Sequence, residues 1–111
     1  MKLSHEDHNE LTIMTLRGEL TVEYVDQLRK AALERIEAHI RDFVLDISDL
    51  NFIDSKGLEA ILWLQEQTSE QLGQIRLAGV GDEVSSILEM TRLAARFECH
   101  ESVETAIQSL Q

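Results

Sequence analysis

Short apolar segments alternate with amphipathic segments of helical periodicity along most of this 111-residue chain. Residues 43–47 and 75–78 are compact apolar runs typical of buried strands, and a helical pattern follows each of them. Strands that are joined through helices use right-handed crossovers and pair in parallel. The first two segments, near residues 2–6 and 11–17, can instead pair as an antiparallel edge. We therefore expect an α/β fold, with a small mixed sheet that is mostly parallel and about four helices packed on it.

Apolar spacing and end signals predict where the helices lie. The first helix is expected to begin at Thr21, a plausible N-cap, after a turn over residues 18–20. A second begins near Ser55, a third at its expected cap Asp82, and a last one at its cap Ser102. The apolar residues expected on the inner faces of the first two helices are Val22, Val25, Leu28, Ala32, Leu33, Ile36 and Ile40, followed by Leu58, Ile61, Leu62 and Leu72.

Composition narrows the classes of function. The formal net charge is −11, so the chain would repel phosphate backbones, and direct nucleic-acid binding is disfavoured. Hydrophobic residues make up 43%, enough for one packed domain over residues 1–111, and no apolar run is long enough to span a bilayer. The acidic start lacks an apolar signal segment, so a soluble cytoplasmic protein is the expectation. Cys99, the single cysteine, is expected to be a small buried residue of a strand at residues 97–100.

The segment Asp54-Ser55-Lys56-Gly57-Leu58 follows directly on a short apolar strand. It places a hydroxyl where a strand ends and an amphipathic helix begins, and main-chain N–H groups and the helix dipole favour negative charge at such a point. A phosphoryl group on Ser55 would be tolerated there and presented to a partner, which makes Ser55 a candidate switch rather than a catalyst. The simpler alternative is that Ser55 is a plain N-cap, although Asp54 could serve equally well.

Other chemistry has little support in the sequence. Motifs for nucleophilic catalysis and for a phosphate-binding loop are missing, and the turn at residues 79–81 lacks the third small residue of a dinucleotide fingerprint. His5 and His8 are spaced for metal ligation, but a solvated surface pair is the simpler interpretation. We therefore expect no enzyme activity, no metal and no cofactor.

The second helix carries the chain's single tryptophan, Trp63. Helical spacing predicts that its ring lies opposite the core side, among Glu59, Glu66, Glu70 and Gln67. An exposed tryptophan is typical of interface hot spots. The alternative is a ring that lies flat against aliphatic stems or a neighbouring segment.

Four segments carry a family resemblance. The most specific is Asp-Ser-x-Gly-Leu at residues 54–58, after an apolar strand and an Asp-Leu turn. The others are residues 16–20 (LRGEL), residues 43–50 (FVLDISDL) and the pattern Val84-x-x-Ile87-Leu88-x-Met90-Thr91-x-Leu93. With these segments in this order, the chain resembles the STAS family, and within it the stand-alone anti-sigma factor antagonists of bacteria. The resemblance covers nearly the whole chain and implies a STAS-like fold.

The resemblance also implies a function by partner switching. Such proteins bind a serine kinase that is also an anti-sigma factor, and the kinase phosphorylates the serine that matches Ser55. Phosphorylation dissociates the complex, and a metal-dependent serine phosphatase restores binding. The residues expected to contact partners lie on the second helix and its start: Asp54, Lys56, Gly57, Glu59, Ala60, Trp63 and Gln67.

One residue departs from the family pattern. The position after the serine is usually small, and here it is Lys56, which could pair with a phosphate or select a different kinase. Lys56 bears on which partner is bound more than on the fold. A second hypothesis is a non-switching STAS accessory subunit of a transport or sensory complex. A phosphoryl-accepting receiver is a weaker third hypothesis, because its acidic pair and lysine are not found in the right order.

Overall fold

Six strands form one sheet in the computed structural model, which describes residues 1–111. The strand order is β1-β2-β3-β5-β6, and β4 pairs with the end of β2. The strands are β1 (Lys2–His8), β2 (Leu11–Leu20), β3 (Asp42–Asp46), β4 (Leu50–Ile53), β5 (Ile75–Ala78) and β6 (Glu98–His100). The helices are α1 (Val25–Glu37), α2 (Ser55–Glu70), α3 (Asp82–Met90) and α4 (Val103–Ser109), with short 3-10 turns η1 (Val22–Tyr24) and η2 (Ala94–Arg96).

The pairing of the strands confirms the predicted mixed sheet. β1 pairs antiparallel with β2, whereas the β2–β3, β2–β4, β3–β5 and β5–β6 pairs are all parallel. Helices connect β2 to β3, β4 to β5 and β5 to β6, as the alternating sequence pattern predicted, whereas residues 47–49 alone connect β3 to β4. The mostly parallel α/β sheet with four helices is therefore the observed fold.

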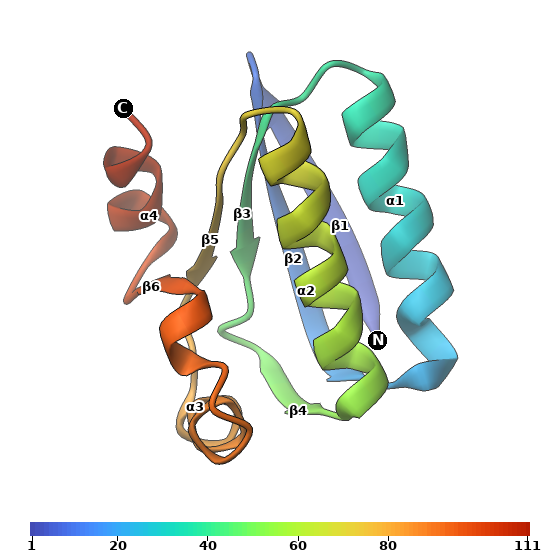
Figure 1. Ribbon diagram of the computed structural model, residues 1–111, viewed down its shortest axis with the longest axis vertical. Helices are drawn as coiled ribbons and strands as arrows, with labels where there is room; N and C mark the ends of the chain where they lie inside the picture. Colours follow the sequence, from blue (N-terminus) through green and yellow to red (C-terminus); the bar gives the residue numbers. More distant parts are fainter.

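Helices cover both faces of the sheet (Figure 1). Leu45 and Leu77 face the main core, which packs against α1 and α2 running side by side. Val44 and Ala78, one residue away in each strand, pack with Ala106 of α4 in a smaller cluster on the other face. This division follows from the two-residue period of a strand, which points successive side chains to opposite faces.

The first helix begins later than predicted, because β2 continues through residues 18–20 instead of turning there. Gly18 has a φ of +96°, and a register shift between Gly18 and Glu19 lets β2 change its neighbour from β3 to β4. Thr21 makes no side-chain cap, and η1 intervenes before α1. Val22 therefore lies in η1 and is exposed, and Leu33 within α1 is also exposed, so the assignment of both residues to the core was wrong.

Three further expectations are corrected by the structure. Leu72 is 87% exposed, because α2 ends at Glu70 and the residue lies in the following turn with a φ of +63°. Asp82 is the first residue of α3 and Gly81 is its N-cap, without a side-chain cap. Cys99 is exposed rather than buried, because its strand β6 forms an edge of the sheet. The predicted Ser102 cap of α4 is confirmed as a reciprocal capping box with Thr105.

Candidate functional site at the start of helix α2

Asp54 is the N-cap of α2, and both of its carboxylate oxygens are used. Oδ1 accepts a hydrogen bond of 2.8 Å from the N–H of Gly57, and Oδ2 accepts one of 3.0 Å from the N–H of Val22. The first bond satisfies a free donor of the helix end, and the second ties η1 to the start of α2. Of the two capping candidates in the sequence, the structure selects Asp54.

Ser55 is the first residue of α2 and is exposed. Because Asp54 performs the capping, the Ser55 hydroxyl is not required to hold the helix end. None of the four surface cavities of the chain is lined by Ser55, so the hydroxyl is not enclosed in a cleft. The residue lies on an open corner where an approaching protein can reach it.

Gly57 and Ala60 are corrections to the predicted partner-contacting set. Gly57 is buried, and a Cβ added there would lie 2.5 Å from the main-chain oxygen of Leu20. Ala60 has 0% exposure and belongs to the main core. Gly57 lets the start of α2 pack closely on β2, Ala60 is part of the core, and neither residue is exposed to a partner.

Lys56 and Glu59 form an exposed ion pair on the first turn of α2, with 3.3 Å between Nζ and Oε2. The spacing of three residues places their side chains next to each other on the helix surface. Both were predicted to lie at the partner surface, and both are accessible there. The cation next to Ser55 is therefore already engaged by a carboxylate of the same turn.

Trp63 is half-buried between α1 and α2 rather than projecting freely. The guanidinium carbon of Arg29 on α1 lies 5.4 Å from the centre of its ring, within the range of a cation–π contact. The structure thus matches the alternative in which the ring lies against a neighbouring segment. Gln67, one turn further along α2, is also half-buried.

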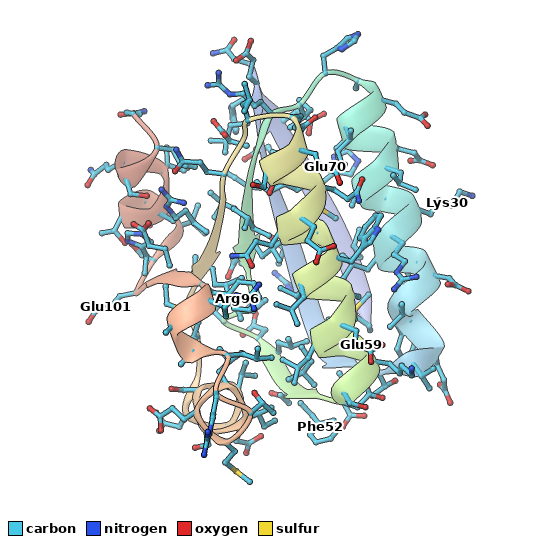
Figure 2. All side chains as sticks on the ribbon, viewed as in Figure 1. Lys30, Phe52, Glu59, Glu70, Arg96 and Glu101 are labelled. Atoms are coloured by element: carbon cyan, nitrogen blue, oxygen red, sulfur yellow. The ribbon has the colours of Figure 1, made fainter.

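Two exposed apolar residues near the start of α2 were missed by sequence reasoning. Val22, 61% exposed, is held beside the helix start by its bond to Asp54, and Phe52, 44% exposed, lies two residues before Asp54 in β4. Figure 2 shows Phe52 and Glu59 at the end of the molecule where α2 begins. Strand alternation could not have predicted the exposure of Phe52, because Leu50, two residues earlier, is buried, and the position of Val22 depends on a contact distant in sequence. We call Val22, Phe52, Ser55, Lys56 and Glu59 the α2 corner.

No group of three or more His, Cys, Asp or Glu side chains is placed to hold a metal ion. Although Cys99 is exposed as a residue, its thiol is partly desolvated, which raises its pKa and favours the unreactive protonated form. No helix is both long and apolar enough to cross a membrane.

Comparison with known proteins yields the same fold and one family. The model of the STAS domain matches residues 2–106. The anti-sigma F factor antagonist of Paenibacillus polymyxa is 26% identical over 112 residues, which cover 100% of this chain and 96% of that protein. This relative supports the resemblance that the segment around Ser55 first indicated.

Solved structures are similar over nearly their whole length. A crystal structure described as an anti-sigma factor antagonist from Thermotoga maritima has a TM-score of 0.90 at 19% identity, covering 97% of this chain and 93% of that one. The phosphorylated form of the Bacillus cell fate determinant SpoIIAA has a TM-score of 0.79 at 19% identity, covering 99% and 100%. Together with the family match over residues 2–106, the sheet and the α2 corner lead to one conclusion: the chain belongs to the STAS domain family.

Proposed function

We propose that this chain is an anti-sigma factor antagonist whose choice of partner is set by phosphorylation of Ser55. The proposal rests on one observation: at the start of α2 the residue that caps the helix and the residue that carries the free hydroxyl are different. Asp54 caps the helix with one oxygen and binds Val22 with the other, and Ser55 is left exposed beside it. The hydroxyl can therefore be modified without removing a bond that holds the fold together.

In the proposed cycle, the unmodified α2 corner binds a serine kinase that is also the anti-sigma factor. During transfer, Oγ of Ser55 forms a bond to the γ-phosphorus of ATP while the bond to the bridging oxygen breaks. ADP leaves, and the hydroxyl proton passes to a base of the kinase. A metal-dependent serine phosphatase later hydrolyses the phosphoserine with water and restores the hydroxyl.

The phosphoryl group would act at the interface rather than on the fold. It adds about −1.5 to −2 charge, which the N-terminal end of a helix tolerates. A like-charge contact across an interface costs several kcal/mol, and about 1.4 kcal/mol is a tenfold change in affinity. One modification can therefore lower the affinity for the kinase by orders of magnitude while the STAS fold stays intact.

The same proposal assigns the rest of the surface a recognition role. Val22 and Phe52 supply exposed apolar area near the start of α2, and Lys56 and Glu59 supply a charged pair. We propose that the protein works in the cytoplasm, by binding proteins and without a cofactor or direct contact with nucleic acid. Its net charge of −11 supports the last point.

The test uses a candidate serine kinase and ATP with the whole chain. Intact mass is expected to rise by one phosphoryl group, and Ser55→Ala is expected to abolish the increase. Ser69→Ala, which changes an exposed serine at the other end of α2, is the matched control and should be modified normally. Full modification of the Ser55→Ala variant would refute the assignment.

A binding assay separates the switch from a non-switching accessory subunit. Ser55→Asp is expected to weaken capture of the kinase, whereas Ser69→Asp is expected to leave it unchanged. Equal capture of the wild-type chain and both variants would instead support a STAS subunit that binds its partner constitutively.

A further inference from the structure

Lys56 is the cation on the first turn of α2, and its partner Glu59 lies between it and Ser55 on the helix surface. At about 100° per residue, Glu59 is rotated about 40° from Ser55 around the helix axis, and Lys56 about 100°. Ser55 and Glu59 are also four residues apart, the spacing of neighbouring side chains on a helix. The ion pair of 3.3 Å therefore draws the Lys56 ammonium towards the side of the helix that carries Ser55.

The segments that meet this turn supply few competing cations. η1 contributes Glu23, the end of β2 contributes Glu19, and Asp54 caps the turn itself, while β4 carries no charged residue. The ammonium group of Met1 lies beside Gly18, two residues before the end of β2. Arg17, further back in β2, is engaged by Asp49 at 3.7 Å. Arg29 of α1 lies over the ring of Trp63, about two turns along α2. Lys56 is thus the cation best placed to neutralise an anion on Ser55.

We propose that Lys56 is an exchangeable counter-charge, which binds Glu59 in the unmodified chain and transfers to the phosphoryl group when Ser55 is phosphorylated. This inference rests on the proposed function of Ser55 and names the residues that set the strength of its switch. A phosphoryl group carries more charge than a carboxylate and three acceptor oxygens, so it competes effectively for one ammonium.

The exchange makes one modification change two groups on the surface. Before phosphorylation, Lys56 and Glu59 neutralise each other, and a partner meets a neutral pair beside the apolar Val22 and Phe52. After phosphorylation, the phosphoryl group is partly neutralised and Glu59 is left as a free carboxylate. The affinities for the kinase and for the phosphatase would therefore depend on the free carboxylate of Glu59 as well as on the phosphoserine.

The experiment installs phosphoserine at position 55 during translation, so no kinase is needed. The second ionisation of the phosphoryl group is followed by 31P NMR as a function of pH in the whole chain. Four proteins are compared with the parent: Lys56→Met, Glu59→Gln, the double variant, and Glu70→Gln, an exposed carboxylate at the far end of the same helix. Thermal melting of each protein verifies that it is folded.

Loss of Lys56 is expected to raise the ionisation midpoint by about 0.2–0.7 pH unit, the range that corresponds to an exposed ion pair. Glu59→Gln is expected to lower the midpoint, and to lower it more when Lys56 is present, because the freed ammonium then binds the phosphoryl group alone. Glu70→Gln should leave the midpoint unchanged. An unchanged midpoint in Lys56→Met, or a Glu59→Gln effect of equal size with and without Lys56, would overturn the proposal.

These outcomes are separate from those that test the proposed function. A kinase that leaves Ser55 unmodified would refute the switch, while the titration would still report on the ion-pair exchange. A flat titration would refute the exchange, while phosphorylation of Ser55 and release of the kinase could still be observed.

Discussion

Replacing Asp54 by alanine tests whether Asp54, and not the Ser55 hydroxyl, stabilises the start of α2. The substitution removes the acceptors of two hydrogen bonds, from Gly57 at 2.8 Å and from Val22 at 3.0 Å. Loss of an N-cap costs about 1 kcal/mol, and loss of the second bond adds roughly 0.5–1.5 kcal/mol. We therefore expect Asp54→Ala to lower the free energy of unfolding by about 2 kcal/mol.

The same magnitude can be expressed as a melting temperature. A chain of 111 residues has an unfolding entropy of roughly 0.23 kcal/mol/K, at about 2.1 cal/mol/K per residue. A loss of about 2 kcal/mol then corresponds to a decrease in Tm of about 9 °C. Differential scanning calorimetry or thermal melting by circular dichroism measures this directly.

Two companion variants locate the effect. Asp54→Asn keeps one acceptor oxygen for Gly57 and should lose about half as much stability, because the amide nitrogen that replaces Oδ2 cannot accept the hydrogen bond from Val22. Ser55→Ala should change the free energy of unfolding by less than about 0.5 kcal/mol, as exposed substitutions usually do. A loss for Ser55→Ala as large as for Asp54→Ala would show that the hydroxyl caps the helix, and the reasoning behind the switch would be refuted.

Three further expectations follow from the packing and the ionisable groups. Gly57→Ala should lower the free energy of unfolding in urea by about 1–3 kcal/mol, because its Cβ would lie 2.5 Å from a main-chain oxygen of β2. Gly81→Ala has nothing within 4 Å of the added atom and should cost less, only the difference of about 0.5–1 kcal/mol between glycine and alanine at an N-cap. Desolvation raises the pKa of Asp7, but hydrogen bonds and the charge of Arg35 outweigh it and lower that pKa below its usual 3.8. The interaction of Asp7 with Arg35 therefore contributes its full stabilisation above pH 3.8, and this stabilisation is lost as the pH falls through the lowered pKa of Asp7. Asp7→Asn should lower the free energy of unfolding by about 0.2–1 kcal/mol at neutral pH and make it depend less on pH in the acid range. Cys99 should react with iodoacetamide more slowly at neutral pH than a free cysteine in a short peptide, because its raised pKa lowers the thiolate fraction; an equal rate would contradict the assigned shift.

The periodic parts of the fold were predictable from the sequence because strands and helices leave different repeats. The compact run that became β3 and the apolar run that became β5 needed no distant partner to be recognised. Ser102 was likewise recognisable as a cap, because its hydrogen bonds join residues close in sequence. Ser55 could be singled out in the same way, from its place between an apolar strand and a helical pattern.

Predictions for single residues were wrong where a contact with a residue distant in sequence overrides the local pattern. Residues 18–20 have the composition of a turn, but they pair in parallel with β4, and this pairing extends β2 to Leu20. Val22 matches the helical period of α1, yet its N–H is held by Asp54 from 32 residues away, and its side chain faces solvent. The spacing within α2 predicted an exposed ring for Trp63, but Arg29 of the neighbouring α1 lies over that ring.

Local periodicity and end signals thus determined the α/β class, the positions of most strands and the serine at the start of α2, because these depend on residues near one another in the chain. Only the tertiary structure decided which of two adjacent oxygen-bearing side chains caps that helix, since the choice depends on the approach of η1 to Asp54. It also decided which apolar residues surround Ser55, because exposure is a property of packed elements and not of sequence spacing.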